Sequence, residues 1–257
     1  MEFGFTEEQL MFRETVYKYA KKEIVPFCEE ADLKSEFSFD VWKKLSEMGL
    51  LGLPFPEEYG GSGADVVTCC LAGEALGQAG GDSGHLPALV AHTYPRTDTL
   101  FQRGTEAQRK KYVPKLATGE WIGCMGLTEP GAGSDAASMQ TTATKKGDRW
   151  VLNGSKTFIT NAPVANVCVV YATVDKKLKH AGISAFIVEK GFKGFSTGKP
   201  FHKMGVRAST TSEVFLEDCE VPEENVLGEI GKGFEYTHET PSWDLSLIHI
   251  CRCRRST

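Results

Sequence analysis

The sequence predicts an α+β protein, with an all-helical region first and a small β-sandwich or β-barrel after it. Capping residues and apolar residues at helical spacing dominate as far as about residue 119. From Glu120 onwards, short segments rich in β-branched and aromatic residues are separated by Gly, Asn and Asp. Because helices precede strands and do not alternate with them, the order favours α+β over a parallel βαβ sheet.

Capping residues mark three helix starts in the first half of the chain, at Thr6, Ser38 and Thr105. Thr105 and Gln108 have the spacing of a capping box, in which each side chain bonds to the other residue's backbone. Pro114 then interrupts or ends this helix, because proline lacks a backbone N–H. Further helices are expected over about 65–77 and 85–102, the latter interrupted near its two prolines.

Short strands are expected throughout the second half. Segments 141–144 and 150–152 flank Lys145 to Asp148 and predict a hairpin with a glycine in its turn. The dipeptide Asn153-Gly154 predicts a second turn, which would join 150–152 to 156–159. Further strands are expected over 167–172, 183–188 and 214–216.

Composition and charge exclude several classes of protein. The chain has 257 residues, 41% hydrophobic and 25% charged residues, and a formal net charge of −5. This balance is typical of a globular protein and attracts no nucleic acid. Apolar runs are too short for a membrane span, and the start does not resemble a signal peptide. Eight scattered cysteines without a C-x-x-C pair indicate reduced, buried thiols rather than a metal site, so a cytoplasmic location is expected.

The most informative segment is the loop from Met125 to Asp135, which holds three glycines and a proline among small polar residues. It has neither the G-x-G-x-x-G spacing of a dinucleotide fold nor the G-K-S/T of a phosphate-binding loop. Its backbone amides and hydroxyls suit a planar heterocycle with polar edges, or a phosphate. The alternative is an ordinary turn between two strands.

Three segments resemble the acyl-CoA dehydrogenase family. The loop Met125–Asp135 resembles its first signature, and Asn153–Ala162 resembles its flavin-edge segment. The third segment is Lys203–Thr210, which leads into Phe215–Gly228. The resemblance runs from about Phe5 to about Tyr236 and implies FAD as the cofactor.

The resemblance also implies which residues hold the flavin. Met125, Leu127 and Thr128, with Gly126 in the same signature, would line the pyrimidine side of the ring. Phe158, Ile159 and Thr160 would cover its other flank, with the Thr160 hydroxyl near N5. Gly133 would allow close approach, and Ser134 would contact flavin phosphate or the pantetheine arm of the substrate. Many family members have Tyr or Phe in place of Met125 and Trp in place of Phe158, and these departures could alter the tuning of the flavin.

No catalytic residue is assigned. The family's base is a glutamate in a C-terminal helical domain, beyond Tyr236. Glu129 lies inside the signature but is expected to be a cap or turn residue, and Glu239 precedes an unhelical stretch. His92 and His202 are expected to be solvent or loop residues. No Ser-His-Asp set or metal cluster can be assembled from the sequence.

Four regions are expected along the chain. These are an N-terminal helical domain (1–119), a middle β domain (120–228), the start of a C-terminal helical domain (229–237) and a non-native tail (238–257). The family's C-terminal four-helix domain would then be largely missing, leaving an inactive fragment.

The resemblance implies α,β-dehydrogenation of acyl-CoA to 2-enoyl-CoA, with electrons passing to an electron-transfer flavoprotein. The full-length form would be a homotetramer or homodimer, with no nucleic acid and no membrane span. Segment 183–191 resembles short- and branched-chain members. Lys177 and Lys179 are candidate contacts for CoA phosphates, or a solvated lysine run. The alternatives are a same-fold acyl-CoA oxidase or flavin monooxygenase, and a non-enzymatic binding fragment.

Overall fold

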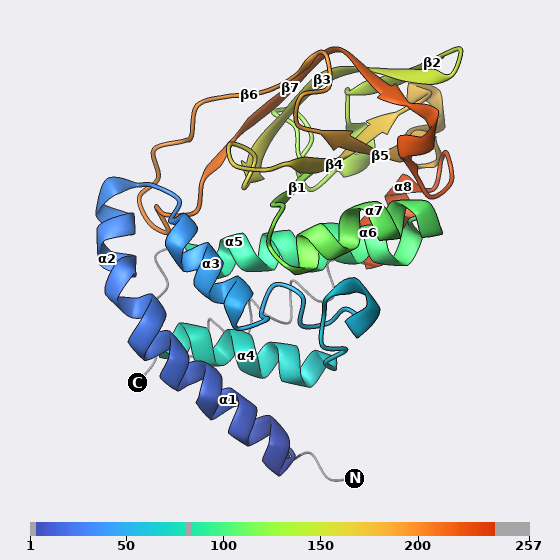
Figure 1. The fold of residues 1–257 in the computed structure, drawn as a ribbon. Coiled ribbons are helices and arrows are strands. Elements are labelled where there is room, and N and C mark those ends of the chain that lie inside the picture. The colour runs from blue at the N-terminus through green and yellow to red at the C-terminus, as the bar shows by residue number, and fades with distance from the viewer. Residues whose placement is uncertain (1–3, 81–83, 240–257) are drawn as a thin grey trace.

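The computed structural model describes residues 4–80 and 84–239. In its helical part the elements are α1 (Glu7–Tyr19), α2 (Val25–Lys34), α3 (Phe39–Glu47), α4 (Val66–Gln78), α5 (His85–His92), α6 (Asp98–Arg103) and α7 (Glu106–Ala117). Helices α5, α6 and α7 lie directly against the β domain, and α1 and α4 lie on the far side of them (Figure 1). None of the helices in these ranges is long and apolar enough to cross a membrane.

The predicted helix starts are confirmed. Thr6 forms a capping box with Gln9, and the Ser38 hydroxyl accepts a hydrogen bond from the Val41 amide. Thr105 and Gln108 form the second capping box, as predicted. These caps satisfy amides that the first turn of a helix leaves without an intrahelical partner.

The prediction for Pro114 is wrong in that it neither interrupts nor ends its helix. Helix α7 continues through Pro114 to Ala117. The last turn carries Leu116 and Ala117, both buried, and their packing outweighs the hydrogen bond that proline removes. Further upstream, the chain passes from α1 to α2 through a π-helical turn at Ala20–Ile24, which sets Pro26 in the first turn of α2.

The strands are β1 (Gly123–Gly126), β2 (Thr142–Lys146), β3 (Arg149–Thr160), β4 (Val167–Thr173), β5 (Ile183–Glu189), β6 (Phe195–Thr197), β7 (Thr211–Pro222) and β8 (Val226–Leu227). They form one connected sheet in the order β6-β7-β3-β2-β4-β5-β8, with β1 parallel to β4. The hairpin from β2 to β3 turns at Gly147, whose φ of 63° suits glycine, as predicted.

The sheet folds over on itself. Strands β2 and β4 are joined by the single residue pair Thr142 and Thr173, so the β3/β7 side can turn to face the β4/β5 side. The rings of Trp150 on β3 and Phe186 on β5 lie 5.5 Å apart in the resulting core. This folded-over arrangement confirms the predicted α+β class with a small sandwich or barrel.

The predicted turn at Asn153-Gly154 is wrong. Strand β3 runs unbroken through it and pairs with β7 on both sides, at Leu152 with Cys219 and at Gly154 with Leu216. Between these pairs the single residue Asn153 faces Glu217 and Asp218, so β7 carries a β-bulge opposite it, and Gly154 adopts a φ of 151°. The Asn-Gly pair therefore lies within a long strand opposite a bulge and does not reverse the chain here.

A short helix, α8 (Gly233–Glu239), begins where the family resemblance predicts a helix start. It packs beside β5 (Figure 1). The predicted non-native tail falls almost wholly on residues 240–257, which lie outside the described residues. Cys28, Cys69, Cys124, Cys168 and Cys219 are buried and unbridged, as predicted.

Candidate functional site

The two flavin motifs of the sequence lie side by side in the fold. Strand β1 leads into the loop Met125–Asp135, and β3 carries the segment from Lys156 to Thr160. The Thr157 amide donates a hydrogen bond of 2.9 Å to the Thr128 carbonyl. The structure therefore joins segments that are some thirty residues apart in the sequence.

A bulge in β3 itself places Phe158 at the surface. The pairing with β7 skips Thr157 and Phe158 between Lys156 and Ile159. Phe158 has a φ of 58° and is 69% exposed, whereas Ile159 is buried in the β-domain core. A bulky residue in the left-handed region and a large exposed ring are each unfavourable, and such features concentrate at ligand sites. The ring contacts only one neighbouring ring in the described chain, that of Phe201 at 5.6 Å.

The signature loop offers backbone and hydroxyl groups. Met125 and Leu127 are half-buried and pack against the core below, so a ligand at the surface meets mainly their backbone. The Thr128, Ser134 and Thr160 hydroxyls make no hydrogen bond within the described ranges. Those donors therefore remain available to a polar ligand.

The glycines of the loop differ in role. A side chain at Gly133 or Gly131 would meet no atom within 4 Å, so the surface there is open. At buried Gly126 a Cβ would lie 3.3 Å from Cγ of Lys156 and 3.5 Å from Sγ of Cys168. Gly126 therefore makes room for the Lys156 side chain beneath the loop.

Glu129 and Lys156 form an ion pair under the loop. Their side chains are 5% and 0% exposed, and Lys156 Nζ lies 2.8 Å from Glu129 Oε1. The same carboxylate accepts hydrogen bonds from the Gln140 amide at 2.6 Å and the Thr141 amide at 3.0 Å. Burial by itself would raise the pKa of Glu129, but the Lys156 ammonium and these amides hold the pKa below its ordinary value. A carboxylate engaged in this way is a structural anchor rather than a free base, in line with the sequence-based expectation.

A shallow pocket of about 290 Å³ lies beside the loop. Its lining includes Asp135 and Ser138 from the loop side and Lys176 and Lys179 from the 175–182 segment. Lys176 donates a hydrogen bond of 2.8 Å to Gln140, whereas no ion pair fixes Lys179 within the described residues. Lys179 thus lines a pocket next to the signature, and Lys177 is not among its lining residues.

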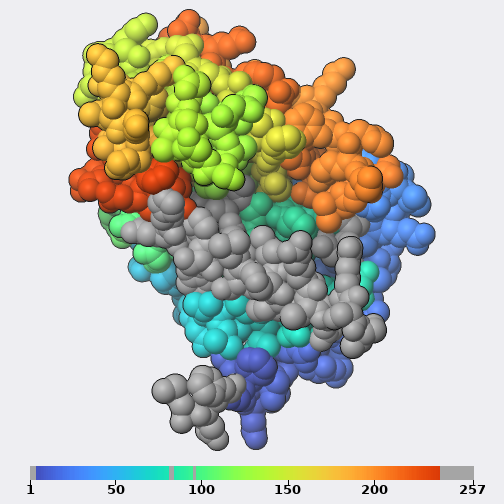
Figure 2. Space-filling model, turned by 180° about the vertical axis from the view of Figure 1, so that it is seen from behind, coloured from blue at the N-terminus to red at the C-terminus, as the bar shows by residue number. Residues whose placement is uncertain are grey.

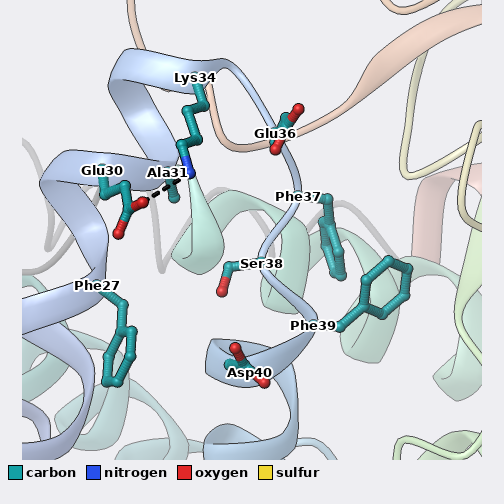
Figure 3. A pocket seen from close by; sticks show the side chains of 9 residues that line it. All are labelled: Phe27, Glu30, Ala31, Lys34, Glu36, Phe37, Ser38, Phe39 and Asp40. Carbon is teal, nitrogen blue, oxygen red and sulfur yellow. Dashed lines mark hydrogen bonds and ion pairs between the residues drawn. The ribbon is translucent and has the colours of Figure 1, made fainter.

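A second pocket, of about 320 Å³, lies between α2 and the start of α3 (Figure 3). It is lined by the rings of Phe27, Phe37 and Phe39 and by an ion pair of 2.6 Å between Glu30 and Lys34. No residue of the three motifs lines it. It is therefore separate from the candidate flavin site.

The expectation that His92 is a solvent or loop residue is wrong. His92 is fully buried at the end of α5, where Nε2 lies 2.9 Å from the Leu116 carbonyl and Nδ1 accepts from the Gly123 amide. Its position, two turns after His85 on an apolar helix, was the signal for burial. His202 is exposed, as expected.

Asn161 is a further residue that the sequence did not single out. It follows Thr160 with a φ of 68° and donates from Nδ2 to the Ala88 carbonyl on α5 at 2.9 Å. Its own amide donates to the Thr210 carbonyl at 2.8 Å. The end of the flavin-edge segment is thereby fixed to a helix of the other domain. Asparagine's tolerance of the left-handed region was the available signal.

The third motif is fixed to the N-terminal helices. The Arg207 amide donates to Asp32 Oδ1 and its Nε to the Ser35 hydroxyl, both at 2.9 Å. The orange segment near residue 200 lies beside the blue helical region in the space-filling view (Figure 2). No group of three side chains suited to hold a metal ion occurs among residues 4–80 and 84–239.

Comparison with known proteins identifies the family. Residues 6–120 match the family model "Acyl-CoA dehydrogenase, N-terminal domain", and residues 124–219 match "Acyl-CoA dehydrogenase, middle domain". The short-chain-specific acyl-CoA dehydrogenase of Clostridium acetobutylicum is 45% identical over 240 residues, covering 93% of this chain and 63% of that protein.

Two solved structures show the same fold. The butyryl-CoA dehydrogenase of Megasphaera elsdenii aligns with a TM-score of 0.92 at 39% identity, covering 98% of this chain and 66% of that one. PigA with FAD and proline aligns with a TM-score of 0.94 at 31% identity and the same coverages. The chain thus spans slightly less than two thirds of these proteins. Both domain models, the fold and the joined motifs lead to one conclusion: the chain belongs to the acyl-CoA dehydrogenase family.

Proposed function

We propose that this chain contributes the flavin-binding part of an acyl-CoA dehydrogenase, which oxidises acyl-CoA thioesters to 2-enoyl-CoA. The observation that carries the proposal is the meeting of the two motifs, with Phe158 exposed on a strained bulge beside the signature loop. Electrons would pass to an electron-transfer flavoprotein.

The residues present fit FAD. An exposed aromatic ring suits a flat heterocycle, and unengaged hydroxyls with an open glycine backbone suit its polar edge and phosphates. Bound FAD supplies the two-electron acceptor for the oxidation. The residues that would hold it are Met125, Gly126, Leu127, Thr128, Gly133, Ser134, Phe158, Ile159 and Thr160. Met125, Gly126, Leu127 and Ile159 would act through their backbone, because their side-chain positions face the protein interior.

The acyl-CoA would lie along the same face of the β domain. Ser134 is exposed next to the pocket that Lys179 lines, so its hydroxyl would contact the pantetheine arm while the ammonium meets a CoA phosphate. The similarity to short-chain and butyryl-CoA enzymes supports a short acyl chain.

The base that removes the α proton is assigned to no residue of this chain. The bonds of Glu129 to Lys156 and to two backbone amides argue against it as the base. In the proposed enzyme a glutamate of the family's C-terminal domain fills this role.

Flavin binding tests the first half of the proposal. We expect the purified chain to retain little FAD, but to bind added FAD saturably in a fluorescence titration. Phe158→Ala removes the exposed ring and should weaken binding by about tenfold. Phe39→Ala, which removes another exposed ring outside the motifs, should leave binding unchanged. Equal affinity of Phe158→Ala and wild type for FAD would contradict the proposed site.

Turnover tests the second half. Residues 1–236 can be joined to the C-terminal domain of the Clostridium acetobutylicum relative, because the two chains are similar throughout the match. Butyryl-CoA should then bleach the bound flavin in the absence of oxygen. Bound flavin that no acyl-CoA bleaches would refute the dehydrogenase, and rapid peroxide formation in air would identify the oxidase alternative.

A further inference from the structure

The buried Lys156 ammonium bonds directly to the backbone of the signature loop. Besides Glu129 Oε1 at 2.8 Å, Nζ donates to the Leu127 carbonyl at 3.2 Å and lies 3.9 Å from Sδ of Met139. The Lys156 side chain is fully buried. A charged group is costly to bury unless it is paired and hydrogen-bonded. The ammonium therefore depends on these few partners.

Two local features bring this ammonium beneath the loop. The β3 bulge turns Lys156 and Thr157 both to the interior, and Gly126 leaves room for the aliphatic stem of Lys156. The partner carboxylate is itself fixed, because Glu129 accepts from the Gln140 and Thr141 amides at the far end of the loop segment. The pair therefore joins both ends of residues 127–141.

The Leu127 carbonyl belongs to the same peptide group as the Thr128 N–H. A cation that donates to a carbonyl oxygen draws electron density from the whole peptide group, which makes its N–H a stronger donor. Within the proposed function, Thr128 is the loop residue that meets the pyrimidine edge of the flavin. This edge gains negative charge when the flavin is reduced, so a stronger donor there favours the reduced form.

We propose that Lys156, held by Glu129, is a positioning residue that fixes and polarises the Leu127–Thr128 peptide group toward the flavin. The inference rests on the proposed function for its ligand, but the effect on the peptide group is present without any flavin. A buried ion pair contributes little net stability compared with a neutral replacement of similar size. A neutral replacement can therefore remove the effect of Lys156 on the peptide group without a large loss of stability.

The test variant is Lys156→Met with Glu129→Gln, which replaces the ion pair by neutral groups of similar shape and leaves no unpaired charge. Lys156→Arg keeps the charge and serves as the conservative variant. Lys145→Met is the matched control, because Lys145 forms an exposed ion pair of 2.9 Å with Glu223 in the same domain. If the double variant does not fold, Glu129→Gln by itself, which keeps Lys156 but removes the carboxylate that holds it, is compared with wild type by the same measurements.

The first measurement needs no flavin. The chain is labelled with ¹⁵N-threonine, and its amide signals are compared by NMR. We expect the Thr128 amide proton to move upfield in the double variant, by more than any threonine signal moves in Lys145→Met. A Thr128 signal that stays in place in a folded double variant would overturn the proposal.

The second measurement uses FAD added to the chain. The ratio of affinities for reduced and oxidised FAD should fall three- to tenfold in the double variant, and a tenfold fall lowers the two-electron midpoint potential by about 30 mV. An unchanged potential with bound FAD would overturn the electrostatic role. If wild-type chain binds no FAD at all, the proposed function fails, whereas the NMR result still decides the coupling of Lys156 to Thr128.

Discussion

The imidazole of His92 accepts a hydrogen bond of 3.0 Å from the Gly123 amide, at the first residue of β1. The other ring nitrogen faces the Leu116 carbonyl on α7 at 2.9 Å, and a carbonyl can only accept, so the proton is assigned to Nε2. A single neutral ring thus connects α5, α7 and β1. This contact sets where the strand that leads into the signature loop leaves the helical domain.

Replacing His92 should destabilise the whole fold. His92→Leu keeps the volume but leaves the Gly123 amide and the Leu116 carbonyl buried without this partner, which should lower the free energy of unfolding by about 2–4 kcal/mol. Urea denaturation measures this change in the free energy of unfolding. His202→Gln, at an exposed histidine, should change stability by less than about 0.5 kcal/mol. Similar values for the two variants would show that the His92 bridge contributes little.

Gly154 should not tolerate a side chain. Its φ is 151°, and a Cβ would lie 2.5 Å from Oγ1 and 2.7 Å from Cα of Thr141. Gly154→Ala should therefore lower the unfolding free energy by roughly 2–5 kcal/mol, through backbone strain and overpacking. Gly133→Ala, where no atom lies within 4 Å, should leave stability nearly unchanged but weaken FAD binding. Thermal unfolding and FAD titration of both variants separate the two roles.

The buried ion pair predicts an acid-sensitive step in stability. Burial alone would raise the pKa of the Glu129 carboxyl. The Lys156 ammonium and the hydrogen bonds to the carboxylate outweigh burial, so the pKa in the folded chain lies below its ordinary value of 4.5. Its ionised form is therefore favoured by folding. This contribution is fully present above the unfolded-state pKa and is lost as the pH falls through the lower folded-state pKa.

Glu129→Gln should remove this step. Wild type should lose stability more steeply than the variant as the pH falls from about 5 to 3, measured by urea denaturation at each pH. Glu213→Gln, at a carboxylate outside the pair, is the control. Parallel curves for wild type and Glu129→Gln would mean that the carboxylate titrates alike in the folded and unfolded chain.

The Arg207 side chain should hold the third motif, residues 203–210, in a fixed conformation. Its amide and Nε donate to Asp32 and Ser35, and a guanidinium N–H reaches the Leu33 carbonyl at 3.3 Å. Arg207→Met should speed hydrogen exchange in residues 203–210, with a loss of global stability of about 1 kcal/mol. Lys193→Met breaks an exposed ion pair elsewhere in the β domain and should leave that exchange unchanged. Unaltered exchange in Arg207→Met would show that other contacts hold the segment.

Local signals in the sequence predicted much of the fold. Caps at Thr6, Ser38 and Thr105 act within one helical turn, and the glycine in the β2–β3 turn meets a local need for positive φ. Such features depend only on residues close by in the sequence, so the sequence alone predicts them. Asn153-Gly154 shows the limit, because the same dipeptide makes a turn or continues a strand depending on whether a distant strand, here β7, pairs on both sides.

For the candidate site too, some features could be predicted from the sequence and others depend on the fold. The family resemblance predicted one site for Thr128, Phe158 and their neighbours, and the fold brings their two segments together. The exposure of Phe158, the burial of Lys156 and the bridge made by His92 come from contacts between residues tens of positions apart.

By itself, then, the sequence determined the α+β class, the family and a set of candidate residues for a flavin site, because caps, turns and motifs are local in the chain. Only the tertiary structure decided which of these residues point outward and what supports them. The β3 bulge turns Phe158 to the surface and Lys156 to the interior, and it forms where β3 meets β7. Burial and strand register depend on the whole fold, and no local pattern encodes them.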